Sequence, residues 1–397
     1  MSFYRRLSPV ERMYLVEDTP ESAPLCHQWV LEGQGELNEA AWRAALHQAA
    51  EANPDARVRL AGRWKWLHWR NDGALPEVIA VDGSQWDGSS EAGAPWLLGP
   101  LPARTGPVCK VYLMSRPTPR VLIRMHHAAM DGRGFMQFIE DIFRCLRGEK
   151  PVGSNSVLTE TDLVRRENPK RLPDPPLNAS SPFGAARGED YQCTWRHVYV
   201  KCNPKRPMPR VMKIVADAAW SHHPDGIVRI RVPADMRRLV KDQISNANLT
   251  GIMDIELTRE DTLESIGEKI KFGVTNKWDM MRFPSNAKLS IAEWLPLSMF
   301  RMTPPIIQRG HANNGLYRYT GTVSNLGRFN EVVHQGGGFV ASRMWAIPVR
   351  YFLLPTFIAL FGNAEGFDVT VGGPKVLFNE GRGDKLIESI RQALLES

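Results

Sequence analysis

The chain has 397 residues, of which 43% are hydrophobic and 23% charged, the composition of an ordinary soluble globular protein. This length exceeds the size at which one hydrophobic core usually stops growing, so we expect two domains or two halves of one. No apolar run approaches the roughly 20 residues needed to span a bilayer, and no apolar signal core follows the first methionine. A cytoplasmic protein without a membrane span is therefore expected, and its formal charge of +7 favours anionic partners without choosing among them.

The cysteines are an odd number and lack CxxC spacing, which argues against a disulfide framework and against a zinc cluster. We expect unpaired, mostly buried thiols and no metal. The five are Cys26, Cys109, Cys145, Cys193 and Cys202.

Alternating strands and helices are predicted over the first 150 residues. One helix begins after Asn38, a suitable N-cap, and carries apolar residues at three- and four-residue spacing until Asn53. Another begins after Asp131, presents an apolar face and ends at Gly148. Extended or alternating patterns predict strands or hairpins at 26–33, 56–70, 108–114 and 120–127, the last two forming one hairpin.

Residues 151–190 differ in composition from the segments on either side. Proline, serine, asparagine, glycine and charged residues dominate, and apolar periodicity fades. We predict a connector, partly ordered at best, between an N-terminal half of residues 1–150 and a C-terminal half of residues 191–397.

The C-terminal half repeats the alternation of helices and strands. Mixed elements with hairpin turns indicate a mixed α/β (α+β) architecture rather than a dinucleotide-binding array. Helices are predicted at 211–220, 261–274, 291–300 and from Asp384 onwards. Strands are predicted at 226–232, 251–257, 317–327, 342–354, 356–363 and 367–373.

The segment RMHHAAMDGRGF, residues 124–135, places two histidines at the end of a predicted strand. Neighbouring side chains on a strand point to opposite faces, so His126 and His127 do not both face one cavity. This argues against a metal site, which would also need a third protein ligand. One histidine at a strand end, with an ordinary pKa near 6.5, suits a general base.

Two roles are open for Asp131 in a catalytic site. It orients the histidine directly, or it pairs with a cation and fixes the loop that carries the histidine. The alternative to a catalytic site is a purely structural one. In it His126 and His127 simply end a strand, and Asp131 caps the following helix.

The segment RWKWLHWR, residues 63–70, interleaves cations and indoles, as a platform for single-stranded nucleic acid does. We favour an ordinary strand, with Trp64, Trp66 and His68 on one face, and expect no nucleic-acid partner.

Residues 126–132, HHAAMDG, match HHxxxDG, the motif of the chloramphenicol-acetyltransferase-like superfamily. That superfamily includes the condensation domains of nonribosomal peptide synthetases, polyketide-associated acyltransferases, wax-ester synthases and alcohol acetyltransferases. Further segments resemble it in the same order, and the resemblance spans most of the chain but is thin over 150–205. These segments are RRLSPVERMYLV (5–16), the stretch 35–60, RIRVPADMRR (229–238) and TGTVSNLGRF (320–329).

The resemblance implies a pseudo-dimer of two chloramphenicol-acetyltransferase-like α/β halves with a channel between them. A thioester donor enters from one side and a nucleophile from the other. In this scheme His127 is the catalytic base and His126 a structural neighbour. Asp131 forms a salt bridge with Arg237 that holds the histidine loop, and Arg238 is the alternative partner.

The same resemblance assigns the remaining parts of the site. Gly132 leaves room for donor atoms, and its amide lies near the reacting carbonyl. Acyl transfer also needs a donor to the tetrahedral oxyanion. Ser324, Asn325 or a backbone amide near Gly132 are the candidates.

The resemblance implies a condensation-type acyltransferase that moves an acyl or aminoacyl group from a pantetheine thioester to an amine or hydroxyl, as in natural-product biosynthesis. The segment NANLTGIMDIEL departs from the "GxFvNt" pattern of peptide-forming condensation domains. This favours a free-standing monomer with no permanently bound cofactor, which takes its donor from coenzyme A or a carrier protein. Alternatives are an acyl-coenzyme-A-dependent O-acyltransferase and a non-catalytic docking domain, although the latter would not need a base.

Overall fold

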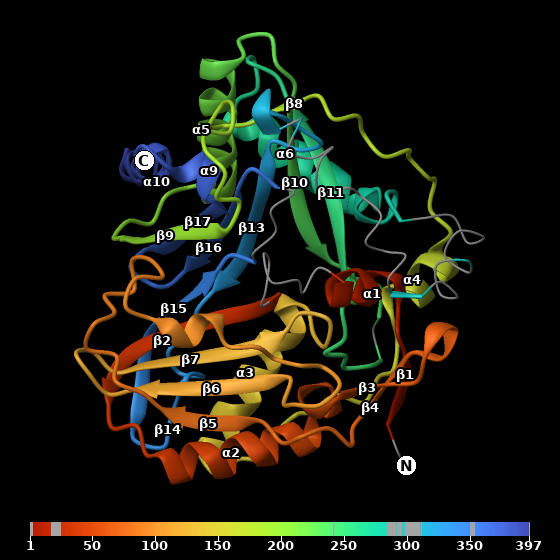
Figure 1. Cartoon of the computed structure of the whole chain (residues 1–397), viewed down its shortest axis with the longest axis vertical. Coiled ribbons are helices and arrows are strands. Elements are labelled where there is room, and N and C mark those ends of the chain that lie inside the picture. The colour runs from red at the N-terminus through yellow and green to blue at the C-terminus, as the bar shows by residue number, and fades with distance from the viewer. Residues whose placement is uncertain are drawn as a thin grey trace.

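The computed structural model describes residues 3–16, 25–240, 242–283, 291, 296–297, 310, 312–349 and 354–396. These residues form two α/β lobes that lie one above the other along the long axis of the molecule (Figure 1). Each lobe contains a six-stranded sheet with its own helices, so the predicted mixed α/β architecture of two halves is confirmed.

The first lobe is built on a sheet with the strand order β14-β15-β2-β7-β6-β5. All neighbouring pairs are antiparallel except β5 and β6. The strands are β2 (Cys26–Gly35), β5 (Glu77–Ala80), β6 (Cys109–Met114), β7 (Arg120–His126), β14 (Gln335–Gly336) and β15 (Phe339–Ile347). Helices α2 (Glu39–Ala52) and α3 (Gly132–Leu146) pack together and contribute to the core of this lobe.

A smaller sheet of order β1-β4-β3 lies beside the first lobe. It consists of β1 (Tyr4–Arg6), β3 (Arg59–Ala61) and β4 (His68–Arg70), and helix α1 (Pro9–Val16) follows β1. Trp64–Trp66 form a 3-10 turn, η2, between β3 and β4, so the predicted alternation over 63–70 is a hairpin and not one strand.

The second lobe has a sheet of order β11-β10-β13-β16-β17-β9. The strands are β9 (Cys193–Val200), β10 (Val228–Asp235), β11 (Thr250–Leu257), β13 (Gly321–Arg328), β16 (Phe357–Gly362) and β17 (Phe367–Pro374). The helices are α5 (Pro207–His222), α6 (Leu263–Thr275), α9 (Lys375–Phe378) and α10 (Arg382–Leu395). Short 3-10 turns complete the fold: η1 (Pro54–Arg57), η3 (Pro95–Leu98), η4 (Met236–Leu239) and η5 (Trp278–Met280).

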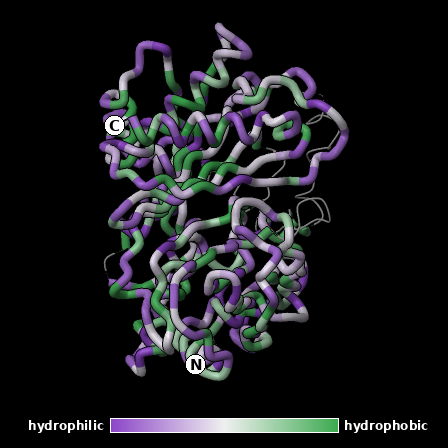
Figure 2. The backbone as a smooth tube through the Cα atoms, turned by 90° about the vertical axis from the view of Figure 1, so that its left-hand side faces the viewer, coloured by the Kyte–Doolittle hydropathy of each residue, from purple (hydrophilic) through white to green (hydrophobic). Residues whose placement is uncertain are grey.

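Each lobe has its own hydrophobic core, and the two cores meet at β16. Ile358 and Leu360 pack with the helices of the second lobe, whereas Ala359 and Phe361 pack in the core of the first lobe. This alternation is that of a strand buried on both faces. In Figure 2, hydrophobic segments run through the interior of each lobe, and many outer turns are hydrophilic.

Strands β14 and β15 come from the C-terminal half of the chain but complete the sheet of the first lobe. Residues 339–347 pair with β2, from Phe339 opposite Gly35 to Ile347 opposite Gln28. The second half of the sequence therefore contributes directly to the lobe that carries the histidine segment, an exchange that local periodicity does not encode.

The connector contains regular structure that the sequence pattern did not predict. Helix α4 (Glu160–Glu167) begins with a capping box between Thr159 and Asp162, and it buries Leu163 and Val164. Farther on, β8 (Ala179–Ser180) pairs with β12 (Leu316–Tyr317). Two adjacent apolar residues give too little periodicity to reveal an eight-residue helix. Helix α1 was not predicted either, and two of the four residues that it buries, Glu11 and Arg12, are charged.

Most of the other predicted elements are confirmed. Asn38 caps α2 by accepting a hydrogen bond from the amide of Ala41 at 3.0 Å. The helix predicted at 291–300 lies largely outside the described residues. The five cysteines all lie in the described ranges, where none of them forms a disulfide and four are buried. Within the part of the chain that the structure describes, no helix is long and apolar enough to cross a membrane.

Candidate active site

His127 lies in the turn directly after β7, and two aromatic rings hold its imidazole. Its backbone amide donates to the carbonyl of Leu25 at 3.1 Å. The rings of Tyr14 in α1 and His27 in β2 each lie 4.0 Å from the His127 ring, centroid to centroid. The residue as a whole is partly exposed, but its Nδ1 is buried. The imidazole is therefore restrained without being sealed off.

The side chains of His126 and His127 point to different sides, as the alternation of side chains along a strand predicts. His27 is the cross-strand partner of Met125 and shares its face of the sheet, and His127 packs on that face beside His27. His126 is buried, and its Nδ1 accepts a hydrogen bond from the amide of Ala128 at 3.1 Å. His126 thus helps to shape the turn that presents His127.

Both of these contacting histidines, His27 and His127, have a lowered pKa and are neutral at physiological pH. Burial lowers the pKa of His127 to about 4. Burial and the neighbouring His127 lower the pKa of His27 well below its ordinary value. Because the carbonyl of Met130 can only accept, Nε2 of His27 donates to it at 3.1 Å. A neutral imidazole is the form that accepts a proton.

Asp131 lies at the N-terminus of α3 and joins the histidine turn to the second lobe. Its carboxylate accepts two hydrogen bonds from Arg237, at 2.9 and 3.0 Å. It also accepts from the amide of Leu249 at 2.7 Å and from the hydroxyl of Thr250 at 2.8 Å. A bond from the amide of Gly134 at 2.9 Å caps the helix. Of the two roles considered for Asp131, the contacts are those of a carboxylate that fixes the loop.

Burial alone would raise the pKa of Asp131, but the Arg237 guanidinium and the hydrogen bonds from Gly134 and Thr250 hold it below its ordinary value. Arg238, the alternative partner, instead binds Asp279 at 2.8 and 3.0 Å. The first of the two adjacent arginines is therefore the one that reaches the histidine turn.

The two glycines at the start of α3 differ in the space around them. A Cβ placed on Gly132 would meet Trp29 at 3.6 Å and Leu326 at 3.7 Å, which are ordinary contacts. A Cβ placed on Gly134 would lie 2.2 Å from the backbone oxygen of Asn246. The protein itself therefore requires glycine at position 134 and not at position 132.

This difference gives a matched pair of variants. Gly134→Ala should destabilise the protein, because the clash involves backbone atoms and overpacking typically costs about 1–3 kcal/mol. Gly132→Ala should leave the stability unchanged or raise it by up to about 1 kcal/mol, because alanine is the better helix former. Urea unfolding of both variants measures this, and equal destabilisation would contradict the geometry.

The segment Ser324–Asn325–Leu326 approaches the histidine segment through Leu326. Leu326 packs against the first-lobe core and is the residue beside Gly132. Asn325 is exposed, and its side-chain oxygen accepts from the amide of Gly327 at 3.0 Å, a local turn contact. Ser324 is buried on β13 opposite Ala359, on the face toward the first lobe. Ser324 is thus better placed than Asn325 to face the site.

Several residues of the site carry no signal in the sequence. His27 and Tyr14 reach His127 only through the pairing of β2 with β7 and the packing of α1. Asn248 and Thr250 come from the segment where β11 (Thr250–Leu257) begins, which departs from the pattern of peptide-forming condensation domains. A single histidine in the stretch CHQW resembles any partly buried strand residue, so local pattern could not single it out.

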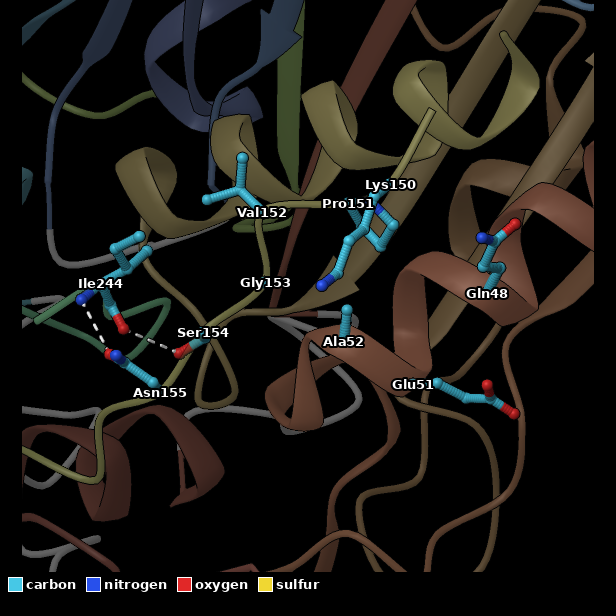
Figure 3. Close-up of a pocket in the computed structure, with 10 residues that line it drawn as sticks. All are labelled: Gln48, Glu51, Ala52, Lys150, Pro151, Val152, Gly153, Ser154, Asn155 and Ile244. Carbon is cyan, nitrogen blue, oxygen red and sulfur yellow. Dashed lines mark hydrogen bonds between the residues drawn. The ribbon is translucent and has the colours of Figure 1, made fainter. Parts of the chain in front are cut away.

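A surface pocket lies beside Ile244, at the beginning of the segment that carries Asn248. It is formed where the end of α2 and residues 150–155 meet Ile244 (Figure 3). Ser154 donates to the carbonyl of Ile244 at 3.2 Å, and the Ile244 amide donates to Asn155 at 3.0 Å. These contacts fasten the 244–250 segment to the first lobe.

Neither a protein-family profile nor a curated protein matches the sequence. Solved structures do match in three dimensions. The first condensation domain of the calcium-dependent antibiotic synthetase, in complex with a substrate analogue, is similar over 100% of this chain and 97% of its own, with a TM-score of 0.69 and 15% identity. The epimerization domain from the third module of tyrocidine synthetase B gives 100% and 97% coverage, a TM-score of 0.63 and 14% identity.

Polyketide synthase associated protein 5 from Mycobacterium tuberculosis is similar over 98% of this chain and 96% of its own, with a TM-score of 0.61 and 13% identity. These structures share both lobes with this chain, and not one half alone. The protein therefore has the fold of a condensation domain, the two-lobed chloramphenicol-acetyltransferase-like fold.

Proposed function

We propose that this protein transfers an acyl or aminoacyl group from a pantetheine thioester to an amine or hydroxyl, with His127 as the general base. The observation that carries the proposal is a neutral imidazole on a partly exposed residue in the turn between β7 and α3, which Asp131 and Arg237 tie to the second lobe. The fold shared with a condensation domain that was solved with a substrate analogue supports the reaction class.

In the proposed reaction the acceptor N–H or O–H gives its proton to His127 while its lone pair attacks the thioester carbonyl. The tetrahedral oxyanion then collapses, the C–S bond breaks, and the thiolate takes the proton from the imidazolium. A positioned general base contributes roughly 10²–10⁴-fold to such a step. No acyl-enzyme is needed, and His127 ends the cycle neutral.

The oxyanion would be stabilised near the N-terminus of α3. The N–H groups in the first turn of a helix point out of its N-terminal end and favour negative charge there. Asp131 already accepts from the amides of Gly134 and Phe135, and of the first two amides of the helix, Gly132 and Arg133, we take Gly132 as the proposed donor, with Ser324 as the side-chain candidate. Oxyanion donors of this kind contribute roughly 10²–10³-fold.

The low pKa of His127 predicts an unusual pH profile. Burial lowers this pKa to about 4, so the free enzyme keeps its base as the pH falls well below 6.5, the ordinary histidine value. The acid limb of kcat/KM, which reports the free enzyme, should therefore appear near pH 4. Steady-state kinetics between pH 4 and 8, with circular dichroism at each pH, measure this. A half-loss of activity near pH 6.5 in folded protein would contradict the assignment.

A panel of donors tests the substrate class. Acyl-coenzyme A, acyl-loaded carrier protein and acyl-N-acetylcysteamine are each incubated with amine and alcohol acceptors, with thiol release and product mass as readouts. We expect acceptor-dependent thiol release from a pantetheine donor that is supplied in trans. Turnover of acyl-coenzyme A with alcohols alone would favour the O-acyltransferase alternative.

Two other outcomes would count against the proposal. Binding of a carrier protein without any turnover would favour a docking domain. Exchange of the α-hydrogen of an aminoacyl thioester with solvent deuterium, without an acceptor, would place the activity with the epimerization domain that shares the fold.

A further inference from the structure

Asn248 is a buried residue of the second lobe that lies against the histidine turn. Its Nδ2 donates to the carbonyl of Ala128, the residue after His127, at 3.1 Å. Because a carbonyl only accepts hydrogen bonds, this contact fixes which end of the amide faces Ala128. The Oδ1 of Asn248 must therefore point elsewhere.

Two buried polar atoms remain unpaired at this place. Within the described part of the chain, Oδ1 of Asn248 and Nδ1 of His127 both lack a hydrogen-bond partner. Leaving a buried polar atom unsatisfied costs roughly 1–3 kcal/mol. One atom is an acceptor and the other becomes a donor when protonated, and the Asn248 side chain acts on the pKa of His127 as a hydrogen-bond acceptor does, so the two atoms suit one hydrogen bond.

We propose that Asn248 is the positioning residue for His127, its Oδ1 holding the proton on Nδ1 so that Nε2 is the nitrogen that acts as base. The inference rests on the proposed function, because it says how the proposed base is oriented. Nδ1 is buried and cannot meet an acceptor that enters from solvent, which leaves Nε2 for that role. Burial has the largest effect on the pKa of His127 and lowers it, whereas a hydrogen bond of its own backbone, the charge of Asp131 and the side chain of Asn248 act to raise it.

Asp131 places Asn248 at this position. The carboxylate accepts from the amide of Leu249 and the hydroxyl of Thr250, the two residues that follow Asn248. Asp131 thereby acts on the imidazole through the second lobe and does not touch it. Asp131 and His127 are thus connected through a segment far away in the sequence, which begins 115 residues after Asp131, at Asn246. The backbone oxygen of Asn246 lies against Gly134.

The tautomer of His127 tests this inference without any substrate. Long-range proton–nitrogen correlation spectra of protein labelled with ¹⁵N-histidine distinguish a protonated Nδ1 from a protonated Nε2, and His127→Gln identifies the resonances of His127. We expect protonated Nδ1 and unprotonated Nε2 in the neutral wild type. Protonated Nε2 would overturn the inference.

Two substitutions of Asn248 separate an acceptor role from a structural one. Asn248→Leu and Asn248→Asp both lose the donor to Ala128, so a merely structural role predicts the same result for both. The acceptor role predicts opposite results: Asn248→Leu loses the Nδ1-protonated form, whereas Asn248→Asp keeps it and shifts the titration of His127 toward higher pH. The other titratable groups around this ring are Tyr14, His27, His126 and Asp131.

Kinetics give a second readout. Asn248→Leu should lower kcat by roughly 10²-fold, the cost of misplacing a catalytic group by about 1 Å, with a smaller change in KM. Asn248→Asp should move the acid limb of kcat/KM toward neutral pH. An unchanged tautomer in folded Asn248→Leu, or identical spectra for both variants, would refute the role of Asn248. A wild type with the expected tautomer but no transfer activity would refute the proposed function alone.

Discussion

Replacing His127 by alanine is expected to lower kcat/KM for acyl transfer by roughly 10²–10⁴-fold, the contribution of a positioned general base. The fold should survive, because His127 lies in a turn and is a partly exposed residue. The substitution removes the packing of the imidazole on the rings of Tyr14 and His27, which is worth about 0.5–1.5 kcal/mol for each pair. Steady-state kinetics together with urea unfolding measure both effects.

His126→Ala is the matched control for this experiment. His126 is buried and accepts from the amide of Ala128, so its removal should reduce stability more than the His127 change does. Activity per folded molecule should fall less than in His127→Ala. Equal losses of activity in both variants would mean that the pair shapes the turn and that neither is the base.

Arg237→Met should have the largest effect on stability. The variant leaves the Asp131 carboxylate almost fully buried and without its cation, and removing one partner of a buried pair costs about 3–5 kcal/mol. The variant also loses the hydrogen bonds that Arg237 donates to the carbonyls of Ser245 and Ala247, just before Asn248, so kcat should fall as well. Urea unfolding and kinetics on the folded fraction measure the two losses.

Arg238→Met provides the control in the adjacent residue. Arg238 pairs with the fully buried Asp279, so this variant should also lose stability. It does not contact the histidine turn, so kcat should stay close to the wild-type value. A comparable fall of kcat in both variants would show that the loss is general and not transmitted through Asp131.

The cost of Arg237→Met should also depend on pH. In the wild type the pKa of Asp131 is held below its ordinary value, so the ion pair stabilises the fold above the unfolded pKa of about 3.9. That stability is lost as the pH falls through the lower, folded pKa. The stability difference between wild type and variant should therefore shrink in acid, and a difference independent of pH would contradict the pairing.

The sequence allowed a large part of the fold to be predicted, for physical reasons that particular elements illustrate. The α3 helix has a cap, a strong apolar face and a glycine stop, all local signals that survive in the structure. No local signal predicts that β14 and β15 complete the sheet of the first lobe, because the choice of pairing partner is a long-range property. Helix α4 was missed because it is short and mostly polar.

The residues of the site also fall into two groups, those that a sequence pattern indicates and those that none does. His127 and Asp131 lie within one short motif, and Arg237 lies in a segment that resembles the superfamily. His27 and Asn248 reach the imidazole from β2 and from the start of β11, in stretches without a distinguishing pattern. Their role depends on which strands pair and on how the lobes meet, and only the folded chain brings them to His127.

The central claim is that His127 is the neutral base of an acyl transfer, and acceptor-dependent thiol release tests it most directly. Wild type and His127→Ala are compared with one acyl-pantetheine thioester, in the presence and absence of an amine or alcohol acceptor. We predict thiol release that requires the acceptor and falls by at least roughly 10²-fold in His127→Ala. Release that proceeds equally well in the variant would contradict the account.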